Sequence, residues 1–426
     1  MSTKPCARTL VGVQSVISYV ALACAVLSLS SIPARAQDQG PSPATDSPPA
    51  AVPATPAPPA LLPAMAGPLA ANPKPTPYDL GPAGKVYITG AVSGFGQSQD
   101  HTSPGDHNNQ WDVSNAQLFI NKPDGLVQFF IQAGMYSLPD LGVPYVRATD
   151  ATKAFYGALP QGYVKLAPSD NFSLMAGALP TLIGAEYTFS FENMNIERGL
   201  LWNQENAVNR GVQANYTTGP LALSVSWNDG FYSKEYSWAW LSATYTVDSA
   251  NTVAVIASGN TRHTNISTLA TPIIQNNERL YNLIYTHTTG AWTLQPYLQY
   301  TEVPAIPEFG WTQSASTSGA ALLLNYNFDS DSTPPGLRLA GFNLPVRMEY
   351  ISSTGSAAGG APNLLYGQGS KAWSITVTPT YQYKEFFTRA EFSYVRASDT
   401  TAGDVFGANG TNRSQTRVLL ETGLLF

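Results

Sequence analysis

The chain has 426 residues, of which only 12% are charged, and its formal net charge is −6 at pH 7. Soluble chains usually carry about a quarter charged residues, yet beyond the N-terminus no apolar run reaches the ~18 residues that a membrane-spanning helix needs. This composition argues against a helical membrane protein, and an acidic balance without a basic patch argues against nucleic-acid binding. The polar character comes from uncharged residues, which suits a β structure with one lipid-facing and one water-facing side.

The first 36 residues have the features of a secretory signal. Lys4 and Arg8 precede an uncharged apolar stretch at residues 10–32, and Ala34-Arg35-Ala36 forms an A-x-A cleavage site. We therefore expect the mature chain to begin at Gln37. A permanent membrane anchor is the alternative interpretation, because the apolar stretch is long for a signal.

Removal of this segment changes the chemistry of the chain. Cys6 and Cys24 are its two cysteines, so the mature chain would have no thiol for a disulfide, a zinc–thiolate site or nucleophilic catalysis. The mature chain would keep 19 basic and 28 acidic residues, a net charge of −9.

Residues 37–84 are rich in Pro and Ala, as in Pro48-Pro49 and Pro58-Pro59. Such a segment cannot pair as strands or pack a core, so we expect a disordered periplasmic linker with extended polyproline II character. It is either a passive spacer or a tether that a periplasmic partner recognises.

From residue 85 onward, segments of about ten residues show period-2 alternation and are separated by turn residues, which is typical of outer-membrane barrel strands. In the clearest segment Val127, Phe129 and Ile131 alternate with Gln128 and Gln132. Sixteen such segments start near residues 85, 111, 126, 160, 171, 210, 220, 236, 251, 278, 291, 317, 336, 370, 386 and 413.

The connections between these segments alternate in length. They are short after even-numbered segments and longer and polar after odd-numbered ones, as in bacterial barrels with short periplasmic turns and longer outer loops. The sequence therefore predicts an all-β fold: a transmembrane antiparallel up-and-down β-barrel of about 16 strands at residues 85–426, with 14 or 18 strands as alternatives.

Aromatic residues cluster at the predicted strand ends, where two belts are expected at the lipid–water interfaces. Those at the outer ends are Trp111, Trp227, Trp238, Trp240 and Trp373. At the C-terminus Leu420, Leu424 and Phe426 resemble the assembly signal of Gram-negative outer-membrane barrels, which the barrel-assembly machinery would recognise.

Two stretches carry a further resemblance. Gly177-Ala178-Leu179-Pro180-Thr181 with Asn195-Ile196-Glu197-Arg198-Gly199, and Asn209-Arg210-Gly211 with Trp227-Asn228-Asp229-Gly230, resemble a bacterial outer-membrane β-barrel porin family. The resemblance covers residues 85–426. It implies an outer-membrane location and solute diffusion, and it supplies no catalytic, cofactor or substrate residues.

Charged residues point to a pore constriction. The third and longest outer loop, residues 180–209, is similar in position, length and acidity to the loop that narrows general porins, and it carries Glu186, Glu192, Glu197 and Arg198. Arg347, Arg389 and Arg417 should face the lumen, because an arginine on the lipid face costs ~2–4 kcal/mol at the bilayer midplane. Either the loop acids oppose this arginine wall across the pore and set its ion preference, or arginines and glutamates on neighbouring strands simply pair.

Enzyme and metal chemistry are not expected. The four histidines are His101, His107, His263 and His287, none of which has the setting of a catalytic base, and the spacing of His101 and His107 matches no recognised metal site. We expect no cofactor and no bound metal.

The sequence thus predicts an outer-membrane porin that lets small hydrophilic solutes diffuse passively, with both termini periplasmic. By analogy with general porins, a homotrimer is a candidate assembly. The alternatives are a non-conducting structural or adhesive barrel, a soluble secreted β protein, and a sugar-selective channel with Tyr187, Phe189, Phe191 and Trp202 as an aromatic track.

Overall fold

The computed structural model describes residues 63 and 65–426. The predicted signal segment, residues 1–36, and the linker up to residue 62 lie outside these residues. Of the linker range, residues 77–84 contain β1 (Pro77–Asp79) and the 3₁₀ turn η1 (Gly81–Ala83).

The described chain forms one antiparallel sheet that closes on itself, because β18 pairs with β2. Sixteen strands build this barrel, as the alternation in the sequence predicts, since β15 and β16 are two halves of one strand and β1 is a short addition beside β2. The strands are β2 (Lys85–Gln99), β3 (Asn109–Lys122), β4 (Val127–Tyr136), β5 (Gln161–Ser169), β6 (Phe172–Pro180), β7 (Val208–Thr218), β8 (Leu221–Asn228), β9 (Trp238–Thr246), β10 (Asn251–Asn260), β11 (Arg279–Thr289), β12 (Trp292–Val303), β13 (Ala315–Asn327), β14 (Phe342–Ser353), β15 (Lys371–Val377), β16 (Thr380–Tyr383), β17 (Phe386–Ser398) and β18 (Ser414–Leu425).

Within residues 65–426, helical structure is confined to the connections between strands. It comprises α2 (Ala148–Ala154) and the 3₁₀ turns η2 (Ser190–Glu192), η3 (Trp202–Gln204), η4 (Gln275–Asn277), η5 (Pro307–Phe309), η6 (Pro335–Leu337) and η7 (Ala357–Gly359). Among the described residues, no helix combines the length and apolar character needed to cross a membrane.

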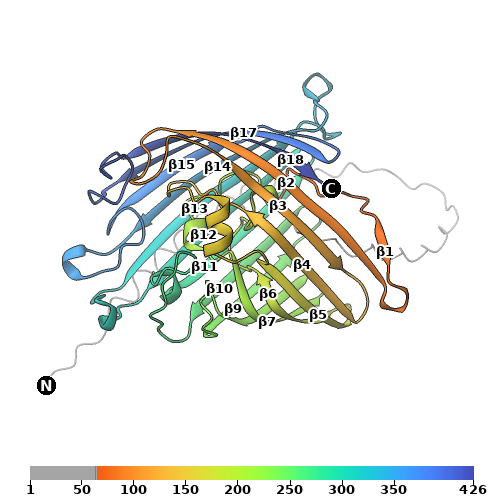
Figure 1. Ribbon diagram of the computed structural model, residues 1–426, viewed down its shortest axis with the longest axis horizontal. Coiled ribbons are helices and arrows are strands. Elements are labelled where there is room, and N and C mark those ends of the chain that lie inside the picture. Colours follow the sequence, from red (N-terminus) through yellow and green to blue (C-terminus); the bar gives the residue numbers. More distant parts are fainter. Residues whose placement is uncertain (1–62, 64) are drawn as a thin grey trace, which may run out of the picture. The chain divides into compact units, whose positions relative to one another are not determined.

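The two rims of the barrel differ (Figure 1). Connections at the long-loop end include L2 (residues 137–160), L3 (181–207), L4 (229–237), L5 (261–278) and L7 (354–370), whereas most connections at the short-turn end have only a few residues. The exception is the turn before β14, which extends to Gly341. The sequence prediction started this strand near residue 336, because exposed Leu337 and Leu339 continue the alternating pattern into the turn.

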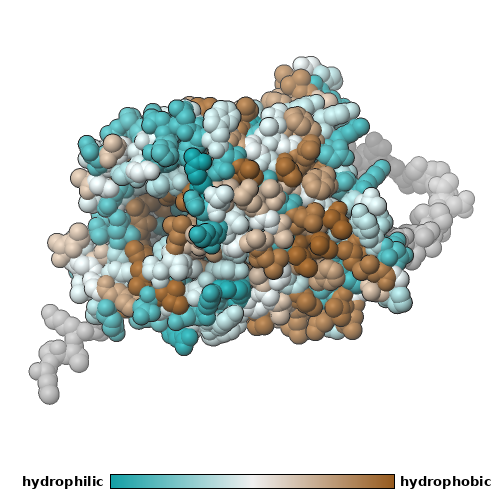
Figure 2. All heavy atoms as spheres, in the orientation of Figure 1, coloured by the Kyte–Doolittle hydropathy of each residue, from teal (hydrophilic) through white to brown (hydrophobic). Residues whose placement is uncertain are grey.

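Alternation along each strand separates an apolar outer face from the lumen. On β18 the outward Leu420 and Leu424 are 54% and 46% exposed, whereas the inward Arg417 and Glu421 are 1% and 0% exposed. Figure 2 shows hydrophobic side chains gathered over the strands of one face, with hydrophilic residues toward both rims. This pattern places the apolar side chains where lipid would contact the barrel.

The aromatic residues follow the predicted belts only in part. Trp111, Trp227 and Trp373 are exposed on the outer face, but Trp238 and Trp240 are each 1% exposed and belong to a buried cluster. The expectation for these two was wrong, because the β9 segment places them in the inward register beside buried Phe231.

The C-terminal residue completes the closing seam. The amide of Phe426 donates to the carbonyl oxygen of Gly90 (3.0 Å), and the amide of Gly90 donates back to Phe426 (2.8 Å). A Cβ at residue 90 would lie 2.4 Å from the phenyl ring, so only glycine accommodates the ring here.

Residues 65–70 lie inside the barrel. Leu69 is 2% exposed and belongs to a buried cluster with the inward side chains of Phe119, Phe130 and Phe387. The amide of Ala66 donates to the carbonyl oxygen of Glu192 in L3 (2.8 Å). The N-terminal segment therefore enters the lumen and reaches L3.

Candidate functional site in the barrel lumen

L3 lies within the barrel and contacts strands that are far away in the sequence. It follows β6 and precedes β7, yet its buried residues contact inward side chains of β14, β17 and β18. The attachment of L3 to the barrel wall can be followed through three wall arginines, Arg347, Arg417 and Arg389.

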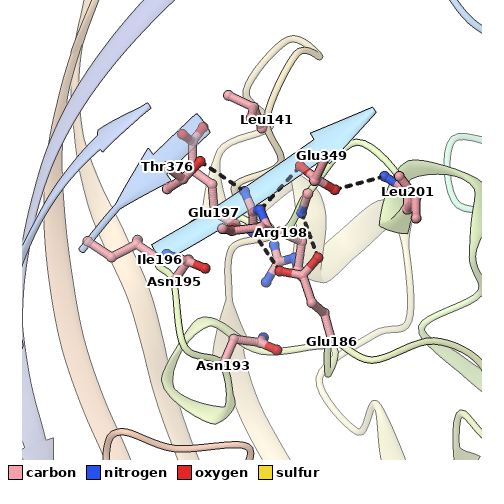
Figure 3. A network of polar contacts seen from close by, with 12 residues as sticks. Leu141, Glu186, Asn193, Asn195, Ile196, Glu197, Arg198, Leu201, Glu349 and Thr376 are labelled. Carbon is pink, nitrogen blue, oxygen red and sulfur yellow. Dashed lines mark hydrogen bonds and ion pairs between the residues drawn. The ribbon is translucent and has the colours of Figure 1, made fainter. Parts of the chain in front are cut away.

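Arg347 on β14 forms the first attachment, and its ion-pair partners Glu186 and Glu349 are labelled in Figure 3. Its Nη1 donates to Glu186 Oε1 (2.6 Å) and to the carbonyl oxygen of Glu197 (2.6 Å). Two positions along β14, Glu349 accepts hydrogen bonds from the amides of Leu200 (3.0 Å) and Leu201 (3.3 Å). One strand thus supplies both a donor and an acceptor to the same loop.

Glycine is required where L3 passes Glu349. A Cβ on Gly199 would lie 2.1 Å from Glu349 Oε1, and the Gly199 amide donates to Glu186 Oε2 (2.8 Å). The backbone of L3 approaches the carboxylate this closely only because residue 199 has no side chain.

Arg417 on β18 forms the second attachment. Its guanidinium donates to Glu197 Oε1 (2.6 Å), to Gln99 Oε1 (2.9 Å) and to the L2 carbonyl oxygens of Asp140 (2.8 Å) and Val143 (2.6 Å). The other oxygen of Glu197 accepts from Ser393 Oγ (2.8 Å). The guanidinium of Arg417 and the carboxylate of Glu197 therefore both have further hydrogen-bond partners besides each other.

Arg389 on β17 forms the third attachment. It pairs with Glu421 on the neighbouring strand (2.5 Å) and also donates to the L3 carbonyl oxygens of Ser190 (2.9 Å) and Asn193 (3.1 Å). Next to it on β17, Glu391 accepts from the amides of Ile196 (2.6 Å) and Glu197 (3.0 Å).

Arg198 joins two loops, L2 and L3, through its hydrogen bonds. Its Nε donates to Asp140 Oδ1 (2.8 Å), and its other nitrogens donate to the carbonyl oxygens of Thr188 and Pro139. Nothing in the sequence singles out Asp140, because one aspartate in a long polar loop has no recognisable pattern.

Glu192 is buried, and none of the ion pairs among the described residues includes it. Its Oε2 accepts from the amide of Phe189 (3.0 Å), which closes the turn η2. Burial raises the pKa of Glu192 to about 8, which the hydrogen bond and the charge of Arg198 only partly oppose. At neutral pH this residue is therefore mostly uncharged.

Glu205 also has a raised pKa. It accepts a hydrogen bond from the hydroxyl of Tyr297, and burial together with the charges of Glu186 and Glu349 raises the pKa of Glu205 to about 8.

The aromatic residues of L3 do not form one continuous track. Phe189 and Phe191 are fully buried and pack against Tyr136 and Phe119. Trp202 alone among these three lines a cavity, and the guanidinium of Arg198 lies 4.9 Å from its ring centre. The two phenylalanines thus anchor L3 to the wall.

The structure therefore brings Glu186 to Arg347 and Glu197 to Arg417, while Arg198 and Arg389 have other main partners. Removing one partner of a buried ion pair typically costs ~3–5 kcal/mol, since the remaining charge is left in a low-dielectric site. This arrangement can fix the path of L3 through the lumen. Within the described part of the chain, no group of three or more His, Cys, Asp or Glu side chains is placed to hold a metal ion.

Comparison with solved structures identifies the same architecture. OmpT, an outer membrane protein of Vibrio cholerae, shares 10% identity and a TM-score of 0.52, covering 81% of this chain and 98% of its own. The outer membrane channel DcaP of Acinetobacter baumannii shares 11% identity and a TM-score of 0.53, covering 80% of this chain and 97% of its own. At these identities the similarity concerns the fold alone.

The comparison with curated proteins finds no match. Residues 85–426, which form the complete barrel, match the family described as "Putative beta-barrel porin-2, OmpL-like". With its sixteen-strand closed barrel and its apolar outer face, the chain belongs to this family of outer-membrane β-barrel porins.

Proposed function

We propose that this barrel lets small hydrophilic solutes diffuse passively across the outer membrane and that L3 narrows its lumen. The observation that supports the proposal is the attachment of L3 inside the barrel by Glu186–Arg347 and Glu197–Arg417. Charged groups in a water-filled lumen influence which ions enter. The acidic mature chain favours a weak preference for cations.

In this proposal the long-loop end faces outward and both termini are periplasmic. Leu420, Leu424 and Phe426, which lie on the outer face of the closing strand, would be recognised by the barrel-assembly machinery. The apolar outer face contacts lipid, and a homotrimer is the proposed assembly by analogy with general porins.

Single-channel recording in a planar bilayer under asymmetric salt tests the proposal. We expect stepwise currents and a reversal potential that indicates weak cation preference. The double variant Glu186→Gln/Glu197→Gln removes both loop partners of the wall arginines. We expect it to raise the conductance, because L3 loses two of the contacts that hold it in the lumen, and to shift the preference toward anions, because Arg347 and Arg417 lose these counter-charges.

The matched control is Glu302→Gln, which changes a partly exposed glutamate on β12 that lies near Arg279 rather than L3. It should leave both quantities unchanged. Absence of current from correctly folded protein would favour a non-conducting structural or adhesive barrel. Unchanged conductance in a folded double variant would contradict the narrowing by L3.

Liposome swelling with sugars of graded size distinguishes a general pore from a sugar-selective channel. Entry rates that depend on size alone support general diffusion. Rates that differ between sugars of equal size would instead support selective transport, for which Trp202 is the aromatic residue in position to stack on a sugar ring.

A further inference from the structure

A cavity of about 350 Å³ lies among the loops of the long-loop end. L2, L3, L4, L5 and L7 all contribute to its lining, and Thr301 of β12 lies in its wall. One lining residue, Leu269, is 57% exposed, which indicates that the cavity reaches solvent. The cavity shares Asp140 and Val143 with the attachment of Arg417, whereas Glu205 and Glu278 are not hydrogen-bond partners of the wall arginines.

Four polar side chains in this lining are nine-tenths or more buried and have an atom without a hydrogen-bond partner among the described residues. These atoms are Trp202 Nε1, Glu205 Oε2, Glu278 Oε1 and Thr301 Oγ1. A buried polar atom without a partner costs about 1–3 kcal/mol. Four residues that line one cavity thus carry polar atoms whose hydrogen bonds a polar group of a ligand would complete.

The charges around the cavity indicate the sign of that ligand. Within the described part of the chain, no Lys, Arg or His side chain forms an ion pair with Glu205 or Glu278. The remaining lining acid, Asp140, already pairs with Arg198. A cation is therefore the ligand that would satisfy the two glutamates.

The rest of the lining is largely apolar and aromatic, with Phe155, Phe231, Leu269 and Ile274 beside the ring of Trp202. Apolar side chains do not coordinate a bare metal ion, and the described residues offer no cluster of three ligating side chains. An organic cation has both the charge and the apolar body that this cavity fits.

We propose that this cavity binds a small organic ammonium ion, with the ammonium group at Glu205 and Glu278 and the apolar body against Trp202. The proposal goes beyond passive diffusion, because binding here requires no current. Its occupants would be amphiphilic primary amines that reach the protein from the long-loop side.

Titration of the two acids supports this assignment. Burial and the charges of Glu186 and Glu349 raise the pKa of Glu205 to about 8, which the hydrogen bond from Tyr297 only partly opposes. Burial and the charge of Glu205 raise the pKa of Glu278 well above its usual range. Glu205 is therefore mostly protonated at neutral pH before the ligand binds. Binding an ammonium ion at neutral pH should release a proton, because the cation stabilises the carboxylate.

Isothermal titration calorimetry of the full-length protein in detergent tests the proposal. The probe is 2-phenylethylammonium, and its neutral and anionic comparators are 2-phenylethanol and 3-phenylpropanoate. We expect the ammonium probe to bind about tenfold or more tightly than either comparator, since charge-assisted hydrogen bonds are the stronger ones. The heat of binding should vary with the ionisation enthalpy of the buffer, which measures the released proton.

Two sets of variants make the test specific. Glu205→Gln/Glu278→Gln mimics the protonated acids, so it should fold, and it should lose about tenfold or more in affinity for the ammonium probe. Ala270→Phe fills the cavity without changing charge and should also prevent binding. Glu302→Gln, outside the lining, is the matched control and should bind as the original protein does.

Equal affinity for 2-phenylethanol and the ammonium probe would overturn the proposal, as would unchanged binding in the double glutamine variant. Absence of binding by the folded original protein would overturn it as well. Heat-modifiable migration in gels confirms folding of each variant. Because this assay measures binding in detergent, its result is independent of whether the barrel conducts.

Discussion

Arg417 illustrates how a fully buried guanidinium is accommodated inside this barrel. It donates to one carboxylate, one side-chain amide and two backbone carbonyl oxygens, and these partners come from L3, β2 and L2. The fork of N–H donors that arginine carries suits such a set, whereas lysine offers a single point of charge. Arg417 therefore links three elements through one side chain.

Arg417→Met should lower the free energy of unfolding by ~3–5 kcal/mol, because Glu197 would remain buried without its counter-charge. The measurement is the urea dependence of unfolding in lipid vesicles. Lys371→Met is the control, since Lys371 forms an exposed pair with Asp399 and should change nothing measurable. If adding Glu197→Gln to Arg417→Met restores none of the lost stability, the two residues are not coupled.

At the scale of the element, L3 depends on protonated acids as well as on ion pairs. Burial raises the pKa of both Glu192 and Glu205 to about 8, compared with 4.5 for a solvated glutamate. The groups that face Glu192 are Arg198 and Tyr187, and those that face Glu205 are Tyr297, Glu186 and Glu349. At neutral pH, Glu192 and Glu205 are therefore mostly protonated while L3 is attached in the lumen, and they would lose these protons if the loop were released.

Between pH 4.5, the pKa of a solvated glutamate, and about pH 8, the pKa in the attached loop, the released loop binds fewer protons than the attached loop. The stability of the attachment therefore falls as the pH rises through this range and is constant above it. We expect hydrogen-exchange protection factors of L3 amides to decrease from about pH 5 to about pH 8. Glu192→Gln/Glu205→Gln should flatten this profile, because the amides cannot ionise. Identical pH profiles for the original protein and this variant would contradict the assignment.

Strands were the most predictable elements, for a physical reason. A wall between lipid and water must alternate apolar and polar side chains, and this alternation is visible in sequences such as Val418-Leu419-Leu420-Glu421. The same rule misplaced the start of β14, since Leu337 and Leu339 continue the alternation into a turn. It also could not reveal the break between β15 and β16, where Pro379 lacks the amide that would continue the ladder.

The contacts of L3 were less predictable than the strands. Sequence reasoning placed Arg347 and Arg417 in the lumen, because charge on the lipid face is costly. It placed Glu186 and Glu197 on the predicted constriction loop. It could not pair them, since the partners meet only when the barrel closes and they are separated by 161 and 220 positions. Glu278 has no sequence signal at all, because its significance comes from burial beside a cavity.

At the scale of the whole molecule, segments of the polypeptide enter the lumen from both ends of the barrel. L3 enters from the long-loop end and residues 65–70 enter from the short-turn end, where Ala70 exchanges hydrogen bonds with Gln382 (2.8 Å each). The two segments meet at the hydrogen bond between Ala66 and Glu192. The linker that the sequence predicts as a spacer thus continues into a segment that occupies pore volume.

Leu69→Asp should displace this segment, because an aspartate would bring a charge into the apolar cluster of Phe119, Phe130 and Phe387. We expect a larger single-channel conductance and faster proteolytic cleavage near residues 65–76, with the heat-modifiable barrel intact. Leu80→Asp is the matched control, since Leu80 is 52% exposed in the same N-terminal region and should leave both measurements unchanged. If Leu69→Asp raised cleavage without raising conductance, the segment would line the lumen without limiting flow, and L3 alone would determine the width of the pore.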